Sequence, residues 1–255
     1  MRSLSCMIGY DAKNSATMPK LSIIIPCYNE EKTLDALLTK VLAITLPVPW
    51  EKEIIVVDDA STDGSSKILA TYADRISSIR QPKNGGKGTA VRTGFAQATG
   101  DYVVIQDADL EYDPGEIAAL LEPIHAGHAE VVYGSRTISP HTVKGSLLPR
   151  TGVRVLTILV NTLHDLQLTD VCTCYKLFPR ESAHLFKAGG FESDILIAAA
   201  LSRAGYRFAE VPITYRPRTR AEGKKIRYRD GLWAIGVLLA DWIIHGGVKR
   251  PRART

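Results

Sequence analysis

Two aspartates and a glutamate stand at alternating positions directly after a short apolar run, and this stretch could bind a metal ion. Asp107, Asp109 and Glu111 follow the apolar residues 103–105. On an extended backbone, side chains at alternating positions lie on one face, so the carboxylates would point the same way. They would repel one another unless a cation lay among them, and hard oxygen ligands suit Mg²⁺ or Mn²⁺. The spacing therefore predicts a metal site, with a solvated acidic loop as the alternative.

A glycine-rich stretch and several polar clusters could bind an anionic ligand. Residues 84–88 read Asn-Gly-Gly-Lys-Gly and precede a predicted helix, where backbone N–H groups favour a phosphate. Lys87 is a candidate for neutralising the phosphate charge, and a flexible glycine loop is the alternative interpretation. Three further polar clusters each follow an apolar run, at residues 27–30, 58–64 and 134–136.

Strand-like and helix-like segments alternate along the chain, which predicts an α/β fold with a mostly parallel sheet flanked by helices. Apolar, β-branched runs predict strands at residues 21–26, 53–57, 76–80, 102–106, 131–133, 169–178 and 208–215. Helical spacing predicts helices at residues 31–43, 65–72, 89–98, 114–126, 147–163, 192–204 and 231–245. The strand at 208–215 contains Pro212 and is therefore expected at a sheet edge. Because ligands of open α/β sheets bind at the carboxyl ends of the strands, the polar clusters are expected to share one crevice.

Composition is that of an ordinary globular protein, with 255 residues, 45% of them hydrophobic and 23% charged. The net charge of +5 is concentrated in the basic residues of 216–229 and 249–254. Such clusters favour a polyanionic partner, but no nucleic-acid-binding motif accompanies them, so nucleic acid is not an expected partner. The four cysteines show no disulfide or zinc spacing and favour a reduced, cytoplasmic environment.

Two apolar helices favour contact with a membrane surface, although neither is predicted to cross it. The run at 232–244 is too short to span a bilayer and contains Asp241. The predicted helices at 147–163 and 231–245 are amphipathic, and the second carries Trp233 and a basic flank, features of interfacial helices. Packing on the protein's own core or on a dimer partner is the alternative. Residues 1–18 lack the apolar core of a signal peptide and are expected to be a disordered extension. These features predict a peripheral protein on the cytoplasmic membrane face, with a homodimer or a membrane-anchoring partner as further options.

The motifs, in this order, resemble those of the family-2 glycosyltransferases of GT-A fold, in particular the dolichol-phosphate mannose synthase-like branch of polyprenyl-phosphate sugar transferases. The resemblance covers about residues 21–229. It is carried by residues 25–30 (Ile-Pro-Cys-Tyr-Asn-Glu), 57–64 (Val-Asp-Asp-Ala-Ser-Thr-Asp-Gly), 84–88, 106–111 (Gln-Asp-Ala-Asp-Leu-Glu), 134–136 (Gly-Ser-Arg) and 211–215 (Val-Pro-Ile-Thr-Tyr). It implies a GT-A catalytic domain at 19–215, followed at 216–255 by a basic donor-closing loop, a hydrophobic helix and a basic tail.

The resemblance implies that five residues hold the nucleoside of a nucleotide-diphospho-sugar donor. Tyr28 would contact the base and Glu30 the ribose hydroxyls, with Pro26 beside them. Val57 and Asp59 would flank the base and ribose.

It further implies that Asp107, Ala108 and Asp109 form the nucleotide- and metal-binding motif. Glu111 would be either a third ligand or a carboxylate behind the ligands.

Three basic residues are implied to face the donor phosphates. Arg136 would pair with the diphosphate or the acceptor phosphate. Arg218 and Lys224 match a basic pair that closes over the donor.

The expected reaction is transfer of a sugar, with inversion, from a GDP- or UDP-sugar to polyprenyl or dolichyl phosphate with Mg²⁺ or Mn²⁺. An attacking phosphate is already anionic and needs no general base, whereas an alcohol would need one, for which Asp194 is the candidate. One alternative is a family-2 enzyme with a glycan, protein or small-molecule acceptor. A second is a non-catalytic subunit that binds nucleotide-sugars.

Overall fold

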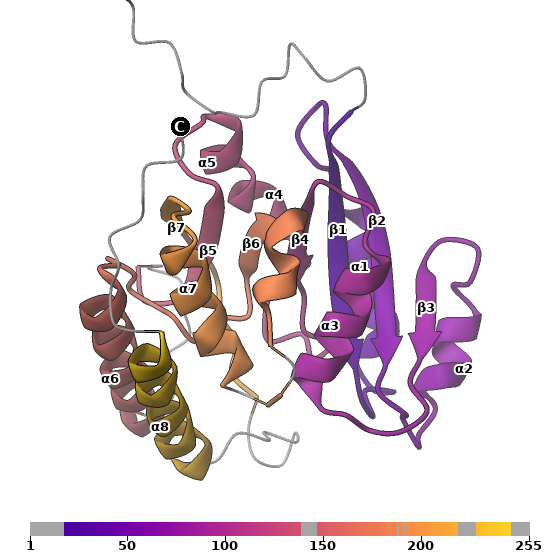
Figure 1. The fold of residues 1–255 in the computed structure, drawn as a ribbon. Helices are drawn as coiled ribbons and strands as arrows, with labels where there is room; N and C mark the ends of the chain where they lie inside the picture. The colour runs from indigo at the N-terminus through magenta and orange to yellow at the C-terminus, as the bar shows by residue number, and fades with distance from the viewer. Residues whose placement is uncertain (1–17, 139–146, 188, 191, 219–227, 246–255) are drawn as a thin grey trace, which may run out of the picture.

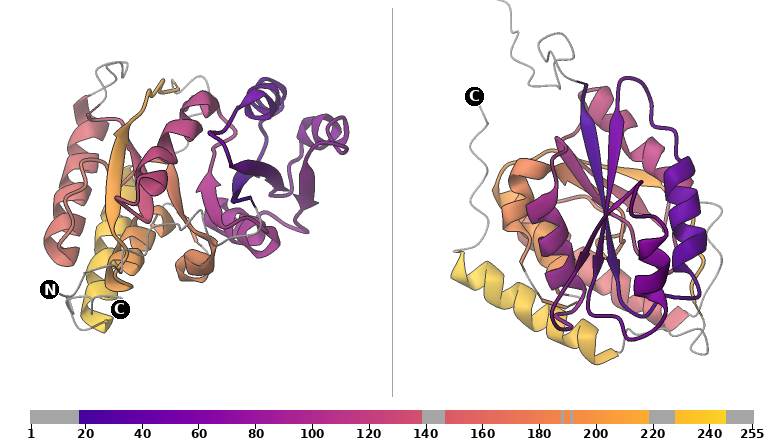
Figure 2. Two further views of the ribbon diagram at one scale, coloured as in Figure 1. Left: turned by 90° about the horizontal axis from the view of Figure 1, so that it is seen from above. Right: turned by 90° about the vertical axis from the view of Figure 1, so that its right-hand side faces the viewer.

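A seven-stranded sheet in the order β3-β2-β1-β4-β6-β5-β7 forms the centre of the protein, and helices cover both of its faces (Figures 1 and 2). The computed structural model describes residues 18–138, 147–187, 189–190, 192–218 and 228–245. The predicted α/β class with a mostly parallel sheet is confirmed.

The first half of the sheet is parallel. β1 pairs with β2 and β4, and β2 pairs with β3. The central strands are continuous apolar runs because helices cover them on both sides, and Ile23, Ile24 and Ile25 are completely buried. The bounds of these strands are β1 (Lys20–Cys27), β2 (Glu51–Asp58), β3 (Ser77–Arg80) and β4 (Tyr102–Ile105).

The second half of the sheet contains one reversed strand. β6 (Lys176–Pro179) runs antiparallel between β4 and β5 (Val131–Ser135), while β7 (Phe208–Pro212) pairs in parallel with β5 at the sheet edge. The edge position predicted from Pro212 is confirmed.

The predicted strand at 169–178 is wrong before Lys176, because residues 169–175 form a loop. The backbone N–H groups of Thr169 and Asp170 donate to the Glu210 carboxylate at 2.8 and 3.0 Å. A side chain thus takes the hydrogen bonds that a neighbouring strand would otherwise accept.

Most predicted helices are present within a few residues of their expected bounds. The exception is 114–126, which is divided into a 3₁₀ turn and two single turns, η1 (Pro114–Glu116), α4 (Ile117–Leu120) and α5 (Glu122–His125). Pro123 has no N–H to donate and interrupts the helical ladder at α5. The remaining bounds are α1 (Leu34–Ala43), α2 (Ser65–Ala70), α3 (Lys87–Gln97), α6 (Leu147–His164), η2 (Arg180–Leu185), α7 (Ser193–Arg203) and α8 (Tyr228–Ile244).

Helix α8 packs beside α6 and α7 (Figures 1 and 2). Its other side exposes apolar residues. Ala234, Leu238 and Asp241 are buried. The Asp241 carboxylate forms ion pairs with Lys187 at 2.8 Å and with Arg203 at 2.7 Å. We call the exposed residues the apolar face of α8: Leu232, Trp233, Leu239, Ile243 and Ile244.

In the part of the chain that the structure describes, none of the helices has the length and apolarity needed to span a membrane.

Candidate active site

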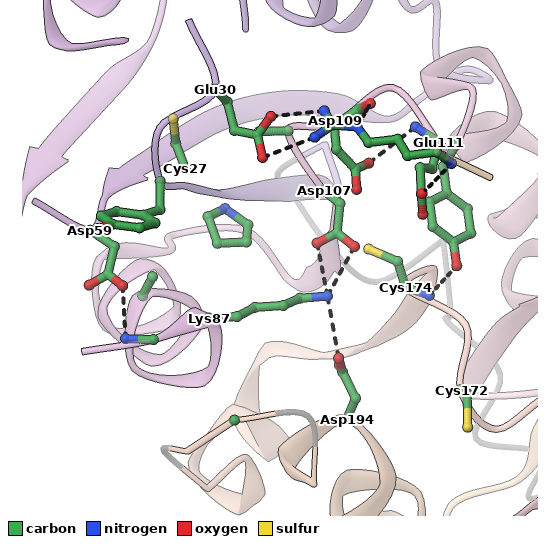
Figure 3. A pocket seen from close by; sticks show the side chains of 18 of the residues that line it. Cys27, Glu30, Asp59, Lys87, Asp107, Asp109, Glu111, Cys172, Cys174 and Asp194 are labelled. Carbon is green, nitrogen blue, oxygen red and sulfur yellow. Dashed lines mark hydrogen bonds and ion pairs between the residues drawn. The ribbon is translucent and has the colours of Figure 1, made fainter. Parts of the chain in front are cut away.

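A pocket of about 580 Å³ opens at the end of the sheet where β1 and β4 finish, and it collects residues from loops far apart in the sequence (Figure 3). It includes most of the predicted site residues: Pro26, Tyr28, Glu30, Asp59, Lys87, Asp107, Ala108, Asp109, Glu111, Arg136, Asp194 and Arg218. The expected convergence of the loops on one crevice is therefore present.

Two predicted residues lie elsewhere. Val57 is completely buried in β2 and is not among the residues that line the pocket, so its side chain packs in the core; its place beside the base stays a prediction. Lys224 falls outside the described residues.

The acidic stretch after β4 forms a turn, so the predicted extended arrangement of its three carboxylates is wrong. The strand ends at Ile105, and Leu110 has a positive φ of 60°. The Glu111 carboxylate accepts hydrogen bonds from the Arg218 backbone N–H at 2.7 Å and the Tyr215 hydroxyl at 2.9 Å. Glu111 is thereby bound to the segment after β7.

Asp109 is a partly buried carboxylate beside other negative charges. Burial, together with the charges of Asp107 and Glu111, raises the pKa of Asp109 to about 7. A nearby divalent cation would favour the ionised form.

The carboxylate oxygens at the pocket floor therefore suit a hard divalent metal. Asp107 and Asp109, which we call the acidic pair, are the candidate ligands. Throughout the described residues, no group of three or more His, Cys, Asp or Glu side chains is arranged to hold a metal by itself. A metal held here would need further oxygen ligands, which substrate phosphates characteristically supply for Mg²⁺.

Lys87 lies between two carboxylates at the first position of α3 (Figure 3). Its Nζ is 2.8 Å from Asp107 Oδ1 and 3.3 Å from Asp194 Oδ2. Burial by itself would lower the pKa of Lys87, but the charges of Asp107 and Asp194 outweigh it and raise the pKa well above its ordinary value. Lys87 is thus a fixed positive charge beside the acidic pair.

The glycine loop before α3 is bound by a carboxylate of the chain itself. The backbone N–H groups of Gly85 and Gly86 each donate to Asp59 at 2.8 Å. Gly86 has a φ of 82°, a conformation that favours glycine. The predicted phosphate cradle therefore holds Asp59, and Lys87 is the group of this loop that remains directed at the acidic pair.

The Arg218 side chain bridges the loop after β1 and the acidic turn after β4 across the pocket. Its guanidinium lies 2.8 Å from Glu30 Oε2 and donates to the Asp109 carbonyl oxygen at 3.0 Å. The predicted ribose-binding residue Glu30 is thus paired with the predicted donor-closing residue Arg218.

Arg136 is held in the pocket wall by a fork of hydrogen bonds to Asp170. Its Nε and Nη2 donate to the completely buried Asp170 carboxylate at 2.6 and 2.8 Å, and its guanidinium lies 4.9 Å from the centre of the Tyr215 ring. A bidentate pair of this kind fixes both the position and the orientation of the guanidinium. Asp170 belongs to none of the motifs and lies in the segment predicted as a strand, so its role could not be expected from the sequence.

Asp194 is a buried carboxylate in the first turn of α7, paired with two lysines. Besides Lys87, it contacts Lys176 Nζ at 3.4 Å. Burial would raise the pKa of Asp194, but the charges of Lys176 and Lys87 outweigh it and lower the pKa below its ordinary value. Lys176 was not among the predicted site residues, although a lysine inside the apolar run Tyr175-Lys176-Leu177-Phe178 is a signal that the sequence contains.

The pocket is also lined by residues that the motifs did not indicate. Trp233 of the apolar face of α8 lines it while 65% of the residue stays exposed. Cys172 and Cys174 line it from the loop before β6, and burial is the largest cause that raises the pKa of each thiol. These thiols are therefore protonated at neutral pH.

Comparison with known proteins identifies the family. The model of "Glycosyl transferase family 2" matches residues 22–186. The chain is 34% identical over 145 residues to an undecaprenyl-phosphate 4-deoxy-4-formamido-L-arabinose transferase of Photorhabdus laumondii, over 55% of this chain and 43% of that protein. It is 28% identical over 214 residues to a dolichol-phosphate mannosyltransferase of Pyrococcus furiosus, over 80% of this chain and 59% of that protein. The chain thus spans about half the length of these relatives.

Solved structures support the fold. A glucosyl-3-phosphoglycerate synthase from Mycobacterium tuberculosis, in complex with Mn²⁺, UDP and glucosyl-3-phosphoglycerate, superposes with a TM-score of 0.67 at 20% identity, over 92% of this chain and 82% of that one. S. aureus TarS in complex with UDP-GlcNAc gives a TM-score of 0.58 at 20% identity, over 88% and 66% of the two chains. At this identity the likeness shows the GT-A fold alone.

Proposed function

The chain belongs to glycosyl transferase family 2, and from this premise we propose that it transfers a sugar, with inversion, from a nucleotide-diphospho-sugar to a polyprenyl phosphate, using Mg²⁺ or Mn²⁺. The observation that carries the proposal is a pocket in which an acidic pair faces fixed cations and whose rim continues into the apolar face of α8. Relatives named as polyprenyl-phosphate sugar transferases support the choice of acceptor.

The donor is proposed to lie between the loop after β1 and the acidic turn after β4. Tyr28 is 36% exposed at the pocket, where an aromatic side chain offers a face for a nucleobase. Pro26 and Ala108 line the same pocket. Because Glu30 is bonded to Arg218, a ribose hydroxyl would join an existing ion pair.

The chemical task of the protein is to stabilise the negative charge that develops on the departing nucleoside diphosphate. A divalent metal held by Asp107 and Asp109 would supply part of this stabilisation as a Lewis acid. Lys87 and Arg136 are held in place by Asp107 and Asp170, so they need little rearrangement to present positive charge. We assign Lys224 to the same task from its motif alone.

The acceptor phosphate needs no general base, because its oxygen is anionic at neutral pH. This suits Asp194, whose carboxylate is paired with two lysines and is a weak base in that state. We therefore assign nucleophilic attack to the acceptor phosphate itself and give Asp194 no proton to remove.

The lipid part of the acceptor is proposed to enter along the apolar face of α8. Trp233 belongs both to this face and to the pocket lining, so a phosphate in the pocket and an isoprenoid chain on α8 could belong to one molecule. The same face would rest on the membrane interface, where exposed tryptophan and aliphatic side chains are stabilised. We accordingly propose a peripheral position on the cytoplasmic membrane face.

Sugar transfer from UDP- and GDP-sugars tests the proposal. Purified protein with Mn²⁺ should form a labelled lipid product only when a polyprenyl phosphate is present, and Asp109→Asn should reduce the rate at least 100-fold while leaving the melting temperature near that of wild type. Transfer to 3-phosphoglycerate but not to lipid would favour a small-molecule acceptor. Binding of donors without any turnover would favour the non-catalytic subunit.

A further inference from the structure

We propose that Lys176 is a positioning residue: with Asp194 it holds Lys87 against Asp107, the candidate metal ligand, without touching substrate itself. This inference rests on the proposed function, because it assigns a task to the same pocket. It concerns a buried lysine that no sequence motif indicated.

Four charged side chains of alternating sign form a continuous chain from the core to the pocket floor. Figure 3 shows the three that reach the pocket, Asp194, Lys87 and Asp107. Lys176 Nζ lies 3.4 Å from Asp194 Oδ1, and Asp194 Oδ2 lies 3.3 Å from Lys87 Nζ. Lys87 Nζ then lies 2.8 and 3.0 Å from the two oxygens of Asp107. Asp194 thus binds a different lysine with each of its oxygens.

The chain begins in the core, where a lone charge would be costly. Lys176 has no exposed surface and does not line the pocket, whereas Lys87, Asp107 and Asp194 all line it. A buried ammonium group is tolerated only when it is paired and hydrogen-bonded. Lys176 meets this condition with the Asp194 carboxylate, the Thr173 carbonyl oxygen and the face of the Tyr133 ring at 5.5 Å.

Each member of the chain comes from a different element. Lys176 begins β6, Asp194 lies in the first turn of α7, Lys87 begins α3, and Asp107 follows β4. The start of α3 is also bonded to the loop before α7, since the Gly88 N–H donates to the Gly189 carbonyl oxygen at 3.0 Å. The four charges therefore fix the relative positions of the elements that meet at the pocket floor.

Removal of Lys176 would leave Asp194 with Lys87 as its remaining described cation. Lys87 would then be drawn toward Asp194 and away from Asp107, which would disturb both the metal ligand and the charge available to the diphosphate. Removal of the Asp194 charge would remove the ion pair that holds Lys87 from the side of α7. Both changes should therefore weaken the binding of a metal–nucleotide complex.

Long-range electrostatics predicts a different result, which makes the inference testable. Lys176→Met removes a positive charge and Asp194→Asn removes a negative one, so their effects on an anionic Mn²⁺–nucleotide complex would have opposite signs. If both residues act by positioning Lys87, both substitutions should lower the affinity. Groups that hold metal ligands in place typically contribute about 10- to 100-fold to affinity or activity.

The experiment measures binding of Mn²⁺ with UDP, and of Mn²⁺ with GDP, by calorimetry. The proteins are wild type, Lys176→Met, Asp194→Asn and the double variant. Lys187→Met is the control, because Lys187 also pairs with a buried aspartate, Asp241, but does not line the pocket. We expect each single variant to lose about 10- to 100-fold in affinity for the metal–nucleotide complex. The double variant should lose no more affinity than the single variant that binds more weakly, and the control should bind as wild type.

Opposite signs for the two single variants, additive losses in the double variant, or wild-type affinity in Lys176→Met would overturn the inference. If Lys176→Met unfolds below the assay temperature, Asp194→Asn, which keeps the side-chain shape, decides by the sign of its effect alone. Failure of the wild-type protein to bind either complex would instead refute the proposed function.

Discussion

Replacement of Asp170 by asparagine removes the charge that holds Arg136 in the pocket wall. In the native protein the completely buried Asp170 carboxylate accepts hydrogen bonds from Arg136 Nε and Nη2 at 2.6 and 2.8 Å and from the Arg136 backbone N–H at 3.1 Å. Asparagine keeps the shape and one acceptor oxygen, but it replaces the other oxygen with a donor that faces the guanidinium.

The loss in stability can be bounded from this geometry. Removal of one partner of a buried ion pair costs about 3–5 kcal/mol, since the remaining charge is left buried without compensation. The Arg136 side chain keeps 16% exposure at the pocket, and the amide oxygen keeps one hydrogen bond, so we expect the lower end, about 3 kcal/mol. For a chain of this size that corresponds to a fall in melting temperature of about 6–12 °C.

Urea unfolding followed by circular dichroism measures this change, and transfer rates at a temperature where the variant is folded measure its effect on the site. We expect the rate to fall about 10- to 100-fold, because Arg136 loses its fixed orientation. Asp74→Asn is the matched control, since Asp74 is 79% exposed and pairs with Arg75 at 3.7 Å, and such a pair contributes at most about 1 kcal/mol. An unfolding free energy for Asp170→Asn within about 0.5 kcal/mol of wild type would refute the reasoning.

Four further outcomes are expected. Burial by itself would raise the pKa of Asp241, but the hydrogen bond from Lys187 and the charge of Arg203 outweigh this effect and hold the pKa below its ordinary value. Asp241 therefore stabilises the fold above about pH 4, and this contribution is lost as the pH falls further; urea titrations from pH 6 to 3 should show a smaller loss for Asp241→Asn than for wild type. Gly88→Ala should destabilise the protein by about 1–3 kcal/mol, because its Cβ would lie 2.5 Å from the Gly189 carbonyl oxygen. Gly236→Ala, whose Cβ would have no atom within 4 Å, should instead stabilise α8 by about 0.5–1 kcal/mol. Scanning calorimetry measures both changes, and a shift of the melting temperature in the opposite direction would contradict either prediction. Treatment with EDTA should abolish sugar transfer, and Mn²⁺ or Mg²⁺ should restore it; an unchanged rate in EDTA would contradict metal use.

The sequence predicted the parallel half of the sheet because its strands are buried on both faces and so appear as continuous apolar runs. Residues 23–25 and 103–105 show this pattern, and both are fully buried. Polar residues at the carboxyl ends of such strands must meet at one sheet edge, which is why the pocket could be anticipated from motif order alone.

The details that were wrong depend on contacts between distant segments. Residues 169–175 have strand-like composition, but Glu210, some 40 residues later, binds their backbone. The direction in which Glu111 points is set by a positive φ at Leu110 and by Arg218, neither of which alternating spacing reveals.

The buried position of Lys176 could not be inferred either. A lysine next to apolar residues is compatible with an exposed strand end. The carboxylate of Asp194, placed beside it by α7, is the negative charge that makes its burial favourable.

The bonds from Gly85 and Gly86 to Asp59 have a consequence for the thermodynamics of donor binding. A glycine-rich loop normally loses much conformational freedom when it closes around a ligand, and that entropy is subtracted from the affinity. Here the loop is already fixed by two 2.8 Å hydrogen bonds within the chain, so its ordering is completed when the protein folds. A donor that binds beside it should therefore show a smaller unfavourable entropy than one that has to order the loop itself.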